Sequence, residues 1–146
     1  MYLLDTNIIS FINLSGKEAS NINKNLNKIL QSNNKIDLFI SAISVQEIHY
    51  GIKNAQSIHG LKYKELLFKN LINFIEADTI VIEYTAKMAI KFAEIKTKLN
   101  RKGFQVDDKD LMIAATAVEA EFTLVTNNTK DFKNISGLIV EDWTVF

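Results

Sequence analysis

Residues 2–7 read Tyr-Leu-Leu-Asp-Thr-Asn, a short apolar run that ends at the carboxylate of Asp5. The run predicts a buried strand over residues 2–5, and the residues after it predict a short helix over 6–14. Aspartate is disfavoured in strands. We therefore expect Asp5 either to cap the following helix or to belong to a functional site.

The same alternation of short apolar runs and longer amphipathic segments continues along the chain. Further strands are predicted over residues 38–42, 79–83, 123–125 and 138–140. Further helices are predicted around residues 22–30, 44–55, 63–75, 85–102 and 108–120. Strands that alternate with helices imply right-handed crossovers and a mostly parallel sheet covered on both faces. The predicted fold class is α/β, a three-layer α/β/α sandwich around a mostly parallel sheet of four to five strands.

Length and composition indicate one globular domain over residues 1–146. The chain has no cysteine, which excludes disulfides, thiol nucleophiles and thiolate metal sites. It has neither an apolar stretch near the roughly 18 residues of a membrane span nor the basic start of a signal peptide, so we expect a cytoplasmic protein. Loops typical of nucleotide-cofactor enzymes are absent. The 17 basic and 17 acidic side chains cancel, so any RNA contact would depend on a local patch or on bound cations.

Two other segments also place a carboxylate in apolar surroundings. Residues 44–51 read Ser-Val-Gln-Glu-Ile-His-Tyr-Gly and contain Glu47, and residues 108–115 read Asp-Lys-Asp-Leu-Met-Ile-Ala-Ala and contain Asp110. An ionised carboxylate is costly to bury without a partner. No arginine or lysine lies within a helical turn of Asp5 or Glu47 in the sequence, and Lys109 is predicted to point to a different side of its helix from Asp110. A divalent cation would neutralise all three acids, and Mg²⁺ and Mn²⁺ prefer oxygen ligands.

Each acid also has a structural interpretation that the sequence leaves open. Ser44 and Glu47 have the spacing of a capping box, in which the glutamate bonds the first amide of its own helix. Asp110 has the position of a first-turn acid that complements a helix dipole, and Asp5 has that of a helix cap.

Taken together, these segments resemble the PIN-domain nucleases, most closely their VapC-like toxin branch. The family's Asp-Thr-Asn is matched by residues 5–7, its Glu-Leu-x-x-Gly helix by residues 47–51, and its Leu-x-Ile-Ala-Ala run by residues 111–115. The segments at 124–132 and 137–143 look like the family's last two strands. The family often carries a fourth acid where this chain has Asn128, with Asp131 three residues further on.

The resemblance implies that Asp5, Glu47 and Asp110 are the catalytic residues and ligate one Mg²⁺ or Mn²⁺, directly or through water. Thr6 and Asn128 would support this site by hydrogen bonds. The chain is then expected to be a metal-dependent endoribonuclease toxin that hydrolyses RNA, often tRNA, pairs with a cognate antitoxin and forms a homodimer. Two rival functions are a PIN-domain nuclease of RNA processing without an antitoxin and a non-catalytic binding module of the same fold.

A basic stripe is predicted on the helix over residues 85–102. It consists of Lys87, Lys91, Lys98 and Arg101. Such a stripe would suit RNA phosphates. Glu94 interrupts it, so a solvated helix face is the alternative interpretation.

Overall fold

The centre of the fold is a parallel β-sheet. The computed structural model describes residues 1–12, 15–31, 38–54, 62, 65–66, 69 and 80–145. Within these residues the strands form one five-stranded sheet in the order β3-β2-β1-β4-β5, and all neighbouring pairs are parallel. The strands are β1 Tyr2–Leu4, β2 Leu38–Ser41, β3 Ile80–Ile82, β4 Thr123–Val125 and β5 Val140–Glu141. The predicted α/β class and parallel sheet are confirmed.

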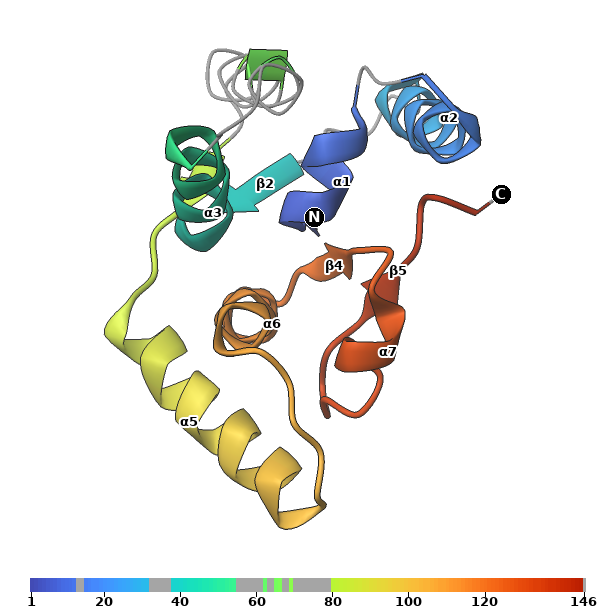
Figure 1. Cartoon of the computed structure of the whole chain (residues 1–146). Coiled ribbons are helices and arrows are strands. Elements are labelled where there is room, and N and C mark those ends of the chain that lie inside the picture. The colour runs from blue at the N-terminus through green and yellow to red at the C-terminus, as the bar shows by residue number, and fades with distance from the viewer. Residues whose placement is uncertain are drawn as a thin grey trace.

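Helices cover the sheet on both faces (Figure 1). In the described part of the chain they are α1 Thr6–Phe11, α2 Lys17–Gln31, α3 Ala42–Lys53, α5 Ala86–Arg101, α6 Asp108–Ala120 and α7 Thr129–Phe132. The short helix α7 was not predicted. The helix predicted over residues 63–75 falls outside the described residues, except at 65–66 and 69. None of the helices described here is long and apolar enough to cross a membrane.

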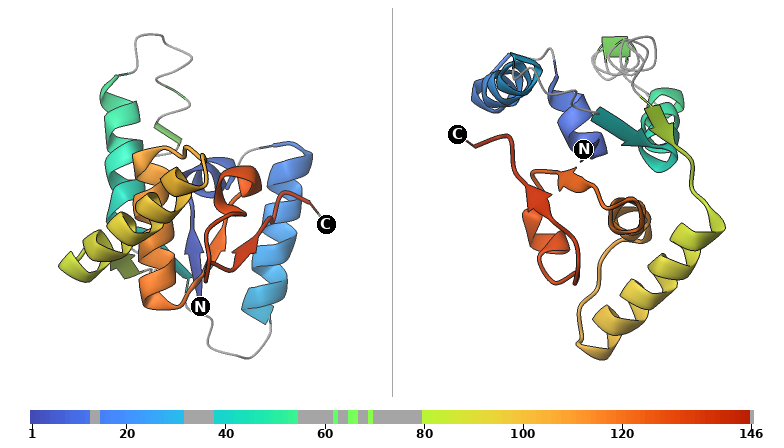
Figure 2. Two further views of the ribbon diagram at one scale, coloured as in Figure 1. Left: turned by 90° about the horizontal axis from the view of Figure 1, so that it is seen from below. Right: turned by 180° about the vertical axis from the view of Figure 1, so that it is seen from behind.

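Alternate residues of the central strands point to opposite faces and so create two cores. One core packs residues of α5 and α6 against a buried residue from each central strand, namely Leu3, Phe39 and Leu124. The other packs residues of α1, α2 and α3 against the next residue along each strand, namely Leu4, Ile40 and Val125. Figure 2 shows α2 on one side of the sheet and α5 and α6 on the other. This is the predicted three-layer arrangement.

The start of α3 corrects the prediction for this helix. It begins at Ala42 and not at Ser44, because Ser41 ends β2 and its Oγ accepts a hydrogen bond from the Ser44 amide at 2.9 Å. Ser44 therefore lies inside the first turn, where its side chain is buried against the Ser41 hydroxyl at 3.0 Å. The strand and helix join without an intervening loop, and this junction places Glu47 close to the carboxyl end of the sheet.

Candidate functional site

Three acidic side chains come from elements next to the carboxyl ends of the central strands. Asp5 comes directly after β1, Glu47 is on α3 after β2, and Asp110 is in the first turn of α6, the helix that leads into β4. In a parallel sheet these strand ends form one edge, which is where ligands bind in open α/β folds. The elements that carry the acids are therefore neighbours, although the acids are far apart in the sequence.

Asp5 is fixed by hydrogen bonds at both carboxylate oxygens. Its Oδ1 accepts from the Thr6 amide at 2.8 Å, and its Oδ2 accepts from the Thr126 hydroxyl at 2.7 Å. The side chain is only 4% exposed. Burial raises the pKa of Asp5, and the nearby charge of Glu47 adds to this, whereas the hydrogen bonds act in the opposite direction. Asp5 does cap α1, which was one of the two interpretations of its sequence position. Its second carboxylate oxygen, however, bonds Thr126 at the end of β4.

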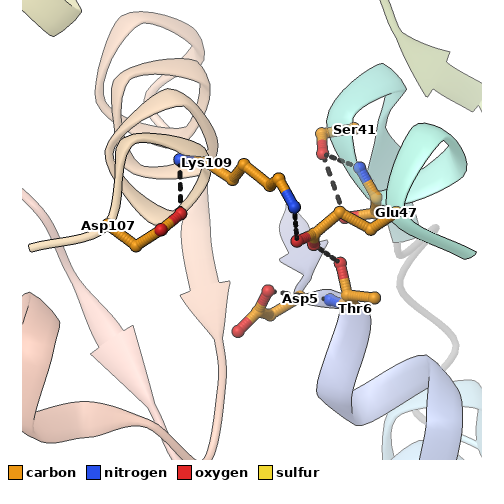
Figure 3. Close-up of polar contacts among 7 residues, drawn as sticks. Asp5, Thr6, Ser41, Glu47, Asp107 and Lys109 are labelled. Atoms are coloured by element: carbon orange, nitrogen blue, oxygen red, sulfur yellow. Dashed lines mark hydrogen bonds and ion pairs between the residues drawn. The ribbon is translucent and has the colours of Figure 1, made fainter. Parts of the chain in front are cut away.

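Glu47 does not take part in a capping box. Its Oε2 accepts a hydrogen bond from the Thr6 hydroxyl at 2.6 Å, and its Oε1 lies 3.6 Å from Lys109 Nζ. Figure 3 shows Glu47 pointing from α3 toward Thr6, with Asp5 beside them. Since Ser41 supplies the N-cap, the capping interpretation of Ser44 and Glu47 is wrong. Thr6, predicted as a supporting residue, connects the backbone beside Asp5 to the carboxylate of Glu47.

Asp110 carries the clearest sign of crowded negative charge. Its pKa is raised from 3.8 to about 6, mainly by burial and further by four neighbouring acids: Asp5, Asp107, Glu47 and Asp131. The N-cap of α6 is Asp107, whose Oδ1 accepts from the Lys109 amide at 2.9 Å. Asp110 is therefore not needed as the cap. The charges of Asp5 and Glu47 therefore act on Asp110, and Lys109, the residue before Asp110, contacts Glu47 directly.

Asn128 links Asp110 to a further acid. Its Nδ2 donates to Asp131 Oδ2 at 2.6 Å and lies 3.5 Å from Asp110 Oδ2. The amide is thus placed between two carboxylates and supplies a hydrogen-bond donor to each. The sequence predicted a supporting role for Asn128, and these hydrogen bonds place it beside Asp110 and Asp131.

Thr126 is a site residue that the sequence analysis missed. It is fully buried at the end of β4. Besides donating to Asp5, its hydroxyl oxygen accepts from Asn7 Nδ2 at 3.2 Å and from the Asn128 amide at 3.0 Å. The signal available in the sequence was its place, directly after a predicted strand. Among the described residues Asn7 Oδ1 is a buried side-chain oxygen without a hydrogen-bond partner, which leaves room for one more donor in this network.

Lys109 brings a cation to the acidic cluster. The sequence predicted that Lys109 points to a different side of the helix from Asp110. Its ammonium reaches across to Glu47 on α3 (Figure 3). Its side chain is 46% exposed, and Nζ lies 5.9 Å from the centre of the Tyr50 ring. One exposed lysine offsets a minor part of the negative charge around Asp110.

The donor set of this cluster fits a hard divalent cation. All the candidate ligand atoms are carboxylate oxygens, which suit Mg²⁺ and Mn²⁺. Within the described ranges, however, no three acidic or histidine side chains are already close enough together to ligate one ion directly. Mg²⁺ typically keeps several waters and binds one or two carboxylates. Asp5, Glu47 and Asp110 therefore fit an ion that is held partly through water.

Two residues of the predicted basic stripe, Lys91 and Lys98, lie away from this cluster. Lys91 and Lys98 line a small cavity of about 90 Å³ together with Val118, near the opposite end of α6 from Asp110. Lys91 pairs with Glu94 at 3.0 Å. Eight residues of helix, about 12 Å, separate Val118 from Asp110, so this part of the stripe does not join the acids.

Comparisons with known proteins agree with this architecture. The model of the family described as "PIN domain" matches residues 2–138. A protein named Ribonuclease VapC2 from Rickettsia felis is 35% identical over 143 residues, 98% of each chain. A tRNA(fMet)-specific endonuclease VapC from Shigella flexneri is 31% identical over 98% of each chain. The crystal structure of VapBC2 from Rickettsia felis, bound to a DNA fragment from its promoter, superposes with a TM-score of 0.76 at 35% identity and covers 97% of this chain and 98% of that one. The chain therefore belongs to the PIN-domain family.

Proposed function

We propose that this chain is an endoribonuclease that hydrolyses RNA phosphodiester bonds with the help of Mg²⁺ or Mn²⁺. The observation that supports this most is the grouping of acids at the carboxyl edge of the sheet: Thr6 bonds both Asp5 and Glu47, and their charges help burial to raise the pKa of Asp110 to about 6. Excess negative charge of this kind is unfavourable unless a cation joins it. The relatives named as ribonucleases match the chain over nearly its whole length.

The residues of the site have distinct tasks in such a reaction. A bound divalent ion supplies charge to polarise the phosphate and lowers the pKa of a water. Asp5 is held rigidly by Thr6 and Thr126, which makes it the fixed ligand. Thr6 orients the carboxylate of Glu47 through its hydroxyl. Asp110 is less tightly bonded and has a raised pKa, so its carboxylate is suited to accept the proton of the attacking water.

The same proposal extends to partners. The solved relative from Rickettsia felis is described as VapBC2 on promoter DNA, a complex of that protein. We propose that this chain is likewise the toxin of a toxin–antitoxin pair, that it forms a homodimer, and that it acts on cytoplasmic RNA such as tRNA. Co-purification with the product of a small neighbouring reading frame tests the antitoxin.

A cleavage assay tests the catalytic part. Total cellular RNA is incubated with the parent chain, Glu47→Gln and Asp110→Asn, each with Mg²⁺ and with excess chelator. Asp108→Asn is the matched control, because Asp108 lies two residues from Asp110 but is exposed and pairs with Lys96 at 2.7 Å. We expect cleavage by the parent and the control with Mg²⁺ alone, and a loss of at least about 10-fold in both site variants. Cleavage that persists in chelator, or in both site variants, contradicts the proposal.

A further inference from the structure

An exposed aromatic ring lies beside the acidic cluster. Tyr50 is three residues after Glu47 on α3, which places both on one side of the helix. The Tyr50 side chain is 64% exposed. Lys109 Nζ lies between them, 5.9 Å from the ring centre and 3.6 Å from Glu47 Oε1. A single exposed aromatic residue is ordinary on a protein surface, but here the ring, an ammonium group and a candidate catalytic acid are neighbours.

Both contacts of the Lys109 ammonium are weak enough to be exchanged. The distance to Glu47 is near the upper limit of an ion pair, and the lysine side chain is 46% exposed. Exposed ion pairs of this type contribute little to stability, and the ring contact lies at the outer edge of the cation–π range. A divalent ion at Glu47 would neutralise the charge that holds Lys109 there. The ammonium would then be available to another anion.

The charge of the site indicates what that anion is. The acids around Asp110 repel a phosphate backbone, and the chain as a whole has no net positive charge to attract one. A lysine at the edge of the cluster supplies a phosphate contact where it is needed. An exposed tyrosine ring can stack on a base, and stacking requires a base that is not already paired in a helix.

We propose that Tyr50 and Lys109 form a nucleotide subsite for single-stranded RNA next to the scissile phosphate. The ring of Tyr50 stacks on the base, and the ammonium of Lys109 pairs with the phosphate of the same or the adjoining nucleotide. The inference rests on the proposed ribonuclease function and assigns two further residues to it. Because every base has a stackable face, the subsite selects unpaired RNA without selecting a base.

Binding and cleavage are measured separately to test the subsite. A fluorescein-labelled single-stranded RNA dodecamer is titrated with protein in Mg²⁺ in an Asp110→Asn background, and anisotropy is recorded at several salt concentrations. Tyr50→Leu removes the ring and Tyr50→Phe keeps it; Lys109→Gln removes the charge and Lys109→Arg keeps it. Phe104→Leu, at a 41% exposed aromatic, and Lys17→Gln, at an exposed lysine that begins α2, are matched controls. KM and kcat for the same RNA are measured without the Asp110 substitution.

We expect Tyr50→Leu to weaken binding by about 5- to 150-fold, the range of one stacked base, and Tyr50→Phe to bind nearly as the parent does. Lys109→Gln should lower the slope of log affinity against log salt by about 0.7, the value of one single-strand phosphate contact. In cleavage, both losses should fall more on KM than on kcat. Parent-like binding by Tyr50→Leu, or an unchanged salt slope in Lys109→Gln, overturns the subsite. If the parent does not cleave RNA but these binding effects appear, the proposed function fails and the subsite stands.

Discussion

Replacing Asp110 by asparagine should stabilise the metal-free protein. The substitution keeps the shape of the side chain and an oxygen that can accept from Asn128, and it removes one charge from a crowded group of acids. Because the pKa of Asp110 is raised in the folded state, folding favours its protonated form. The stability that this group contributes is fully present below about pH 3.8 and is lost as the pH rises through about 6. At pH 7.5 the ionised carboxylate therefore opposes folding.

The size of the effect follows from the shift. A difference of about two pKa units, from 3.8 to about 6, corresponds to roughly 3 kcal/mol. Solvent screening at this partly exposed side chain reduces the figure to about 1–2 kcal/mol. The loss of a first-turn acid from α6 costs about 0.5 kcal/mol. We therefore expect a net gain of about 1 kcal/mol in the free energy of unfolding, or about 2–4 °C in Tm.

Urea denaturation in excess chelator, from pH 5 to pH 8, measures this gain. The difference between Asp110→Asn and the parent should be largest at pH 7.5–8 and should shrink toward pH 5, where the parent carboxyl is largely protonated. Asp108→Asn removes an exposed acid paired with Lys96 and should give no gain. A variant that is less stable than the parent at pH 7.5, or a gain that is the same at every pH, would show that the ionised Asp110 carboxylate does not oppose folding.

Other expected outcomes concern Thr126, Lys109, the anchoring of α7 and the effect of Mg²⁺ on stability. Thr126→Val removes the hydroxyl that bonds Asp5, Asn7 and the Asn128 amide. It should lower the free energy of unfolding by about 1–3 kcal/mol in urea denaturation and should lower RNA cleavage. Thr126→Ser keeps the hydroxyl and should retain the stability and the cleavage of the parent. Lys109→Met frees Glu47 from its ion pair and should tighten Mn²⁺ binding in a calorimetric titration. Weaker Mn²⁺ binding by this variant would show that Lys109 helps to hold the ion. Phe132 of α7 is 1% exposed in the core beside α6, so Phe132→Ala should lower the free energy of unfolding by about 3–5 kcal/mol. A loss below about 1 kcal/mol in the same denaturation assay would show that α7 is not anchored there. Mg²⁺ at about 100 times its Kd should raise the free energy of unfolding of the parent by about 2.7 kcal/mol, and that of Asp5→Asn by clearly less. Thermal denaturation with and without chelator measures the difference.

Much of the fold could be predicted from sequence because its signals are local. The run that ends at Leu4 is apolar on both sides of the strand, as a strand buried on both faces of a parallel sheet must be. The start of α3 was misplaced because Ser41 and Ser44 are both good caps, and the choice between them depends on where β2 ends. The four-residue α7 has too few residues to show a helical period.

The site was partly predictable for a related reason. Asp5 and Glu47 lie in segments whose order matches a known family, and their convergence follows from a parallel sheet. Thr126 and Lys109 are different, since their roles depend on side chains that meet from distant segments. No local pattern distinguishes the threonine that bonds Asp5 from other threonines after a strand, or shows how far a lysine side chain will reach.

Anomalous diffraction from crystals of the protein soaked in MnCl₂ can show whether a divalent ion binds between Asp5, Glu47 and Asp110, as we propose. We expect a manganese peak among these three side chains, with a carboxylate oxygen of at least one of them bonded directly to the ion and the others reached through water. An anomalous peak elsewhere on the molecule, or none in this cluster at saturating Mn²⁺, would contradict it.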